Sequence, residues 1–142
     1  MKAFVETLKG STKRTRYDET TFRFKESFEV DIPYPYDYGF IIGTNKKQTD
    51  CIDCYILSKT DLKEGDIVDC SVLGMFEMLE DNEIDHKVLL SNRIDKPIEI
   101  DNEIKQIQEF IETIFKKFSE VEVKFGRTLG IEETQAYIIS NS

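Results

Sequence analysis

Short runs of alternating or continuous apolar residues fill the chain up to about residue 90, and they predict β-strands. The pattern predicts strands at residues 4–8, 15–18, 22–30, 40–42, 51–57, 67–79 and 87–90. The second and third of these flank the polar segment Glu19-Thr20-Thr21, which is typical of a hairpin turn. The tyrosine- and proline-rich segment 33–39 is predicted to be a loop, because proline cannot donate a hydrogen bond to a sheet.

The period of the pattern changes in the last third of the chain. Apolar residues recur there at helical spacing, namely Ile104, Ile107, Ile111, Ile114, Phe115 and Phe118. Asp101 or Asn102 is the expected N-cap. A short strand at 121–125 and a second amphipathic helix at 131–139 are expected to follow. Strands followed by helices predict an α+β, mainly β fold: a small closed OB-like β-barrel with two C-terminal helices packed on it.

The length of 142 residues suits a single domain that spans residues 1–142. Hydrophobic residues at 39% and charged residues at 33% are typical of a globular protein. No apolar run is long enough for a transmembrane helix. Glu6 interrupts the N-terminus before the core of a signal peptide can form, so a cytoplasmic location is expected.

The formal net charge of −9 argues against nucleic-acid and anionic-membrane partners, because both are polyanions. It does not exclude a small phosphate substrate, since bound divalent cations reverse the local sign of the charge. Binding of such a substrate is therefore expected to depend on metal.

Three cysteines and one histidine raise the alternative of a Cys₃His zinc site. Cys51 and Cys54 form a C-x-x-C pair, which Cys70 and His86 would complete. The pair lies within a predicted strand, however, where residues three apart face opposite sides. We therefore expect the cysteines to be small buried hydrophobic residues rather than ligands.

Acidic residues gather in two segments about thirty residues apart. The first holds Asp50 and Asp53, and the second runs from Glu80 through Asp85. Carboxylate oxygens are the ligands that Mg²⁺ prefers, although acidic loops are more often only solvated turns. The tyrosine-rich segment 33–39 and the basic cluster 13–16 favour a functional site, because they add hydroxyl donors and cations to the carboxylates.

Several motifs occur in order along the chain and resemble those of family I soluble inorganic pyrophosphatases. They are Tyr34-Pro35-x-x-Tyr38-Gly39-Phe40-Ile41, Thr49-Asp50-Cys51-Ile52-Asp53, Lys63-x-Gly65-Asp66-Ile67-Val68, Val72-Leu73-Gly74 and Glu80-x₄-Asp85-x-Lys87. The resemblance covers the chain from Phe4 to about Ile138. It implies the fold of that family and, less strongly, its activity.

The resemblance implies hydrolysis of inorganic diphosphate to two orthophosphates by a water activated by Mg²⁺, with Mn²⁺ or another divalent ion as a substitute. It implies Asp50 as general base, and Asp50, Asp53, Asp85 and Glu80 as metal ligands. The residues implied to bind the substrate phosphates are Arg14, Arg16, Tyr38, Lys87 and Lys116. Glu6 occupies an outer acidic position, and a homo-oligomer is expected.

The chain departs from the family pattern at several working positions. Gln48 stands where the family has the first Asp of its signature, so one anionic metal ligand is missing. Phe115 stands where a Tyr is expected. Arg16 occupies a family Glu and Glu26 falls near a family Arg. A turn centred on Thr20-Thr21 places Arg16 opposite Lys25 or Glu26 on the neighbouring strand. We interpret Arg16 and Glu26 as an ion pair that has exchanged strands, with both charges on one face and Glu26 facing inward.

Two alternatives to the enzyme stay open. The first is a catalytically impaired relative that binds metal or phosphate, which Gln48 would favour. The second is an oligonucleotide-binding barrel, which suits the fold but not the net charge.

Overall fold

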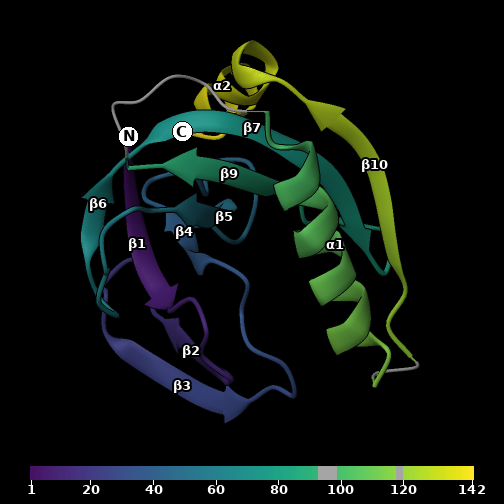
Figure 1. The fold of residues 1–142 in the computed structure, drawn as a ribbon. Helices are drawn as coiled ribbons and strands as arrows, with labels where there is room; N and C mark the ends of the chain where they lie inside the picture. Colours follow the sequence, from purple (N-terminus) through teal and green to yellow (C-terminus); the bar gives the residue numbers. More distant parts are fainter. Residues whose placement is uncertain (93–98, 118–119) are drawn as a thin grey trace.

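A strongly curved β-sheet forms the body of the molecule, with a separate hairpin at one end and two helices packed on it (Figure 1). The computed structural model describes residues 1–92, 99–117 and 120–142. The strands are β1 (Lys2–Thr7), β2 (Lys13–Tyr17), β3 (Phe24–Glu29), β4 (Asp37–Ile41), β5 (Asp53–Leu57), β6 (Ile67–Asp69), β7 (Ser71–Glu80), β8 (Glu83–Ile84), β9 (Lys87–Ser91) and β10 (Val123–Leu129). The helices are α1 (Asp101–Phe115) and α2 (Ile131–Ser140).

The strands of the main sheet follow the order β10-β7-β9-β5-β4-β1-β6, and β8 pairs with β7. Pairing is antiparallel except between β5 and β9, which are parallel. β6 and β7 flank Cys70, so the segment 67–80 pairs with β1 at its start and with β9 and β10 further along. The mainly β fold with two helices is confirmed. A closed barrel is not, because β6 and β10 remain unpaired with each other in the described part of the chain.

Apolar side chains fill both faces of this sheet. On β5, Cys54 and Ile56 enter one buried cluster, whereas Tyr55 enters the other. The first cluster receives Ile138 of α2, and the second receives the apolar stripe of α1 that includes Ile107. The two helices therefore cover different parts of the sheet, α2 against β7 and α1 on the opposite side (Figure 1). Neither described helix has the length and apolarity needed to cross a membrane.

Some predicted boundaries are wrong. The loop predicted at 33–39 ends early, because β4 begins at Asp37 and lies centrally between β1 and β5. The prolines precede this strand, so they remove no hydrogen bond from it. Helix α1 starts at Asp101 with Ile100 as N-cap and without a side-chain cap, so neither predicted cap is used. Phe118 lies outside the described residues.

Other predicted elements are close to those observed. Helix α2 covers Ile131–Ser140, one residue more than predicted. β10 extends four residues beyond the predicted end at Phe125, through Gly126 to Leu129. β3 begins at Phe24, because Phe22 adopts a positive φ of 58° in the hairpin turn.

Candidate active site

Lys87 is the centre of a buried polar cluster at the start of β9. The parallel register of β5 and β9 places Asp53 beside Lys87, and Asp85 lies two residues before Lys87. The Lys87 ammonium donates to Asp53 Oδ2 at 2.6 Å, to Asp85 Oδ1 at 3.0 Å and to the Tyr38 hydroxyl at 3.2 Å. Its side chain is only 6% exposed. One cation therefore serves two carboxylates and a phenol.

The pKa values of these carboxyl groups are driven apart by their surroundings. Burial opposes the charge of Asp53, but Lys87 and Arg14 outweigh it, so the pKa of Asp53 is lowered. Burial raises the pKa of Asp85, and the neighbouring charge of Asp53 adds to this. Burial also raises the pKa of Glu80, where a contact with Asp85 adds to the effect. The site thus holds more carboxylates than its cations neutralise, which favours a bound cation.

Arg14 is the second cation of the cluster and extends from β2. Its guanidinium donates to the Tyr34 hydroxyl at 3.0 Å and lies 4.8 Å from the centroid of the Tyr38 ring. Burial acts to lower the pKa of Arg14, but the neighbouring phenols and Asp53 hold that pKa well above its ordinary value. Arg14, Tyr38, Asp53, Asp85 and Lys87 are therefore brought together as predicted.

Two further carboxylates approach the cluster from the N-terminal part of the chain. Glu6 on β1 is 5% exposed and accepts the Tyr17 N–H at 2.9 Å. Burial raises its pKa to about 7. Glu19, in the hairpin turn, accepts the Cys51 N–H at 2.8 Å, and burial together with the charge of Asp50 raises its pKa. Glu19 was not among the predicted site residues, because a glutamate in a polar turn carries no signal that separates it from solvated residues.

Asp50, the predicted general base, is exposed. It lies in the segment between β4 and β5, next to the Cys51 amide that Glu19 holds. Gln48 of the same segment donates to the Tyr137 hydroxyl at 2.7 Å and to Asn141 Oδ1 at 3.2 Å. The side chain that replaces a family carboxylate thus hydrogen-bonds to α2.

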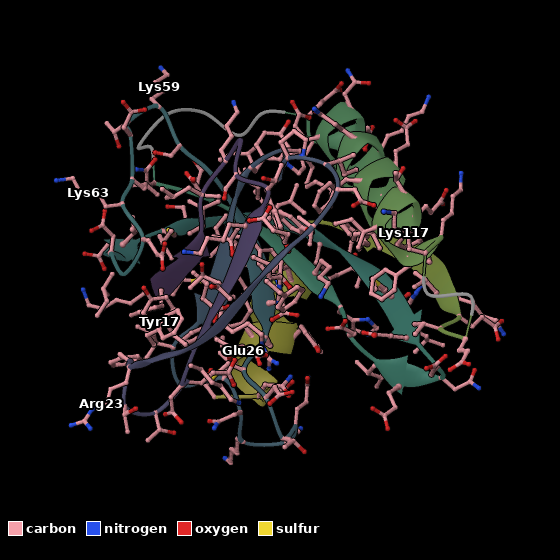
Figure 2. The ribbon with its side chains drawn as sticks, turned by 90° about the horizontal axis from the view of Figure 1, so that it is seen from below. Tyr17, Arg23, Glu26, Lys59, Lys63 and Lys117 are labelled. Atoms are coloured by element: carbon pink, nitrogen blue, oxygen red, sulfur yellow. The ribbon has the colours of Figure 1, made fainter. Side chains whose placement is uncertain are left out.

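Arg16 lies directly opposite Glu26 in the β2–β3 ladder, which is one of the two partners expected from the sequence. Arg16 Nη1 donates to Glu26 Oε1 at 2.9 Å, so the two side chains share a face. The expectation that Glu26 faces inward is wrong, since its side chain is 49% exposed on the hairpin (Figure 2). The hairpin forms a sheet of its own, so that face is open to solvent.

Lys116 is exposed at the C-cap of α1. No described contact joins it to the Lys87 cluster. Its neighbour Lys117 extends from the same end of the helix (Figure 2). Lys117 forms an ion pair with Asp31. Phe115, the last residue of α1, is partly buried and packs against the same apolar cluster as the rest of the helix.

The donor chemistry of the site fits a hard divalent cation, since its acidic side chains offer only carboxylate oxygens. Across residues 1–92, 99–117 and 120–142, however, no three His, Cys, Asp or Glu side chains converge on one point. The reason is visible at Asp53 and Asp85, whose oxygens both contact Lys87. Asp53, Asp85 and Glu80 are the residues that would hold a cation, with Asp50 completing the set from the neighbouring segment.

The cysteines and the histidine occupy separate surroundings. Cys51 packs with Phe4 and Phe40, whereas Cys54 and Cys70 lie in a different core cluster. All three are buried free thiols. Nδ1 of His86 accepts the Met78 N–H at 2.9 Å. Cys51 and Cys54 thus lie in different clusters, although Cys51 precedes β5, which begins at Asp53 rather than at the predicted residue 51.

A mainly β fold thus brings clustered carboxylates, a buried lysine and an arginine together at one site. The family model described as "Pyrophosphatase: Inorganic pyrophosphatase" matches residues 3–138. The chain therefore belongs to the inorganic pyrophosphatase family, which confirms the resemblance found in its motifs. By family it is an enzyme, an inorganic diphosphatase. The family as a whole works with divalent metal ions.

Solved structures agree with this assignment at the level of the fold. The inorganic pyrophosphatase of Thermus thermophilus has a TM-score of 0.84 at 24% identity, over 99% of this chain and 88% of that one. That of Neisseria gonorrhoeae has a TM-score of 0.86 at 20% identity, over 99% and 88%. That of Helicobacter pylori has a TM-score of 0.81 at 19% identity, over 99% and 90%. No curated relative matches the chain by sequence.

Proposed function

We propose that this chain hydrolyses inorganic diphosphate to two orthophosphates at the Lys87 cluster, with Mg²⁺ as the preferred divalent ion. The observation that carries the proposal is the shared contact of Lys87 with Asp53 and Asp85, 2.6 and 3.0 Å away. A buried ammonium held between two carboxylates is positioned to exchange one of these partners for a phosphate oxygen. Phosphoryl transfer needs such positioning and charge neutralisation more than covalent chemistry.

Each side chain of the cluster has a role in this proposal. Lys87 and Arg14 bind substrate oxygens, and the Tyr38 hydroxyl, which already contacts Lys87, hydrogen-bonds to a phosphate. Asp53, Asp85 and Glu80 would hold a divalent cation, which would supply charge neutralisation and lower the pKa of a bound water. Asp50 accepts the proton of the attacking water. Asp50 is exposed, so a water from solvent can reach its carboxylate.

Arg16 and Lys116 belong to the proposal as outer phosphate-binding residues. Both are cations outside the buried cluster, so they would meet the substrate at its solvent side. Arg16 already forms an ion pair with Glu26, so its guanidinium would have to contact both Glu26 and a substrate phosphate.

Orthophosphate release from diphosphate, with and without Mg²⁺, tests the enzyme. We expect metal-dependent release by the wild-type chain and a loss of at least about a hundredfold in Asp50→Asn, since general-base catalysis is worth about that much. Release that does not exceed the Asp50→Asn background would falsify the proposal. Diphosphate binding without release would instead support the catalytically impaired relative, which the hydrogen bonds of Gln48 to α2 favour.

We further propose that the chain acts as a homo-oligomer of a single-domain subunit in the cytoplasm. Analytical ultracentrifugation at several concentrations tests the oligomer, and a sedimentation coefficient of a monomer throughout would contradict it.

A further inference from the structure

Gln48 and α2 are joined across a long stretch of sequence. The Gln48 amide donates to the Tyr137 hydroxyl at 2.7 Å and to Asn141 Oδ1 at 3.2 Å. The Lys46 N–H donates to the Asn141 carbonyl at 3.0 Å. Asn141 is itself fixed, because it is 3% exposed and its Nδ2 donates to the Tyr137 carbonyl at 2.8 Å. The loop before β5 is thus fastened to the C-terminal end of α2 at two positions.

The same loop is also tied at its base and its exit. The Ile52 N–H donates to Thr44 Oγ1 at 2.9 Å, and Thr44 Oγ1 donates to the Ile41 carbonyl at 2.6 Å. The Cys51 N–H donates to Glu19 at 2.8 Å. These bonds hold the backbone on both sides of Asp50, while its own side chain remains exposed.

Tyr137 has a second neighbour in the site. Its ring lies 5.4 Å from the ring of His86, measured between centroids. His86 directly follows Asp85 and is anchored by the Met78 N–H at its Nδ1. Tyr137 therefore contacts the segment of Asp85 through His86 and the segment of Asp50 through Gln48.

We propose that Tyr137 is a positioning residue that sets the separation between the Asp50 segment and the Asp85 segment, acting through Gln48 and His86. Gln48 is then an anchor of the loop and not a metal ligand. The loop is held by the protein itself, whether or not a cation is bound. The catalytic part of this inference rests on the proposed function, whereas the structural part does not.

Hydrogen–deuterium exchange of peptide 43–52 in metal-free protein tests the structural part. Tyr137→Phe removes the acceptor of the Gln48 amide and retains the ring that contacts His86. We expect exchange of this peptide to become about fivefold faster, as the loss of one net hydrogen bond allows. Tyr36→Phe is the matched control, because the Tyr36 hydroxyl also bonds to a glutamine, Gln106, at 3.0 Å but away from Gln48. It should leave peptide 43–52 unchanged.

Substitution of Gln48 separates the hydrogen bond from its side-chain volume. Gln48→Met has a similar length but no polar atoms, so it should reproduce the faster exchange. Gln48→Glu can accept the proton of Tyr137 but cannot donate to Asn141 Oδ1, so it should restore slow exchange only in part. Unchanged exchange in Tyr137→Phe, or an equal rise in peptide 43–52 and in β5, would overturn the proposal. The second outcome would indicate general destabilisation.

Steady-state kinetics test the catalytic part. If the proposed function holds, Tyr137→Phe should lower kcat about tenfold and leave KM for diphosphate within about twofold, because the phosphate-binding side chains are untouched. A rise in KM with unchanged kcat would contradict positioning of Asp50. Absence of activity in the wild-type chain would refute the proposed function only, since the exchange experiment requires no turnover.

Discussion

The Lys87 ammonium lies between Asp53 on the neighbouring parallel strand and Asp85 on its own segment, at 2.6 and 3.0 Å. The Lys87 side chain is buried at 6% exposure, whereas those of Asp53 and Asp85 are partly buried at 24% and 29%. Burial alone would lower the pKa of Lys87, yet its anionic partners hold that pKa well above the ordinary value. Lys87 is therefore charged, and its charge neutralises part of the negative charge of Asp53 and Asp85.

Lys87→Met should destabilise the protein by about 3 kcal/mol at pH 7, because two partly buried carboxylates lose their shared cation. The loss should shrink at pH 5, where the carboxyl groups of the variant bind protons more readily. Chemical denaturation at both pH values measures this. Lys2→Met is the control, since it breaks the exposed Lys2–Asp69 pair of β1 and β6 and should cost less than about 1 kcal/mol. Equal losses in the two variants would contradict a buried triad.

Glu6 gives the fold a dependence on pH. Burial raises its pKa from 4.5 to about 7 in the folded chain, so the folded state binds the proton more tightly than the unfolded state. The stability from this group is fully present below pH 4.5 and is lost as the pH rises through 7. The change amounts to at most roughly 3 kcal/mol.

Glu6→Gln should remove this dependence, because the amide stays neutral and its oxygen can still accept the Tyr17 N–H. Unfolding free energies between pH 5 and pH 8 measure the difference between variant and wild type. The unfolding free energy of the variant should increase relative to that of the wild type as the pH rises. Glu26→Gln, at an exposed position of β3, should show no such gain over this window. A constant difference between Glu6→Gln and wild type would show that Glu6 stays charged.

Gly39 of β4 pairs with Val5 and lies against the backbone of β1. A Cβ at Gly39 would collide with the backbone carbonyl oxygen of Phe4 on the neighbouring strand β1. Gly39→Ala should therefore cost at least about 3 kcal/mol of unfolding free energy, since backbone cannot yield as a side chain does. Gly130→Ala is the control, because nothing lies within 4 Å of a Cβ at that position. Similar melting temperatures for the two variants would contradict the packing.

The β2–β3 register shows how far sequence reasoning reached. The exchanged charges of Arg16 and Glu26 predicted a cross-strand pair, and the ladder contains it. That inference worked because hairpin neighbours are close in sequence and a turn fixes their pairing. The inward direction of Glu26 could not be read, because it depends on which face the hairpin turns toward the main sheet.

Long-range partners were the part that the sequence did not reveal. Gln48 bonds to a tyrosine 89 positions away, and Glu19 reaches a backbone amide 32 positions away. Such contacts are created by the folding of the sheet, so no local pattern encodes them. Asp53 and Lys87 are also far apart in sequence, but the family motifs predicted both as site residues. The same resemblance implied an outer acidic position for Glu6, which the structure shows to be buried with its carboxylate on the Tyr17 N–H.

The Arg16–Glu26 pair should contribute little to stability, because both side chains are more than 40% exposed. Arg16→Glu and Glu26→Arg should each lower the unfolding free energy by about 0.5 kcal/mol, because each places two like charges opposite each other. The double variant restores opposite charges, so it should recover the loss. A double-mutant cycle by chemical denaturation measures this coupling. KM for diphosphate in the double variant should stay within about twofold of wild type, since a cation remains on the same face. A large rise would assign Arg16 a specific contact with the substrate.

Substitution of Gln48 tests whether position 48 can contribute a carboxylate to the proposed metal site. Gln48→Asp should tighten Mn²⁺ binding about tenfold, because an anion is added beside Asp50, and ligand charge sets affinity for hard cations. The shorter side chain should also lose its hydrogen bond to Tyr137, so exchange in peptide 43–52 should become faster in the metal-free variant. Gln48→Asn is the matched control, with the same length and no charge. Calorimetric titration of the apoprotein measures the affinity. Equal Mn²⁺ affinity in the two variants would show that position 48 lies beyond reach of the cation, which would leave anchoring as its only role.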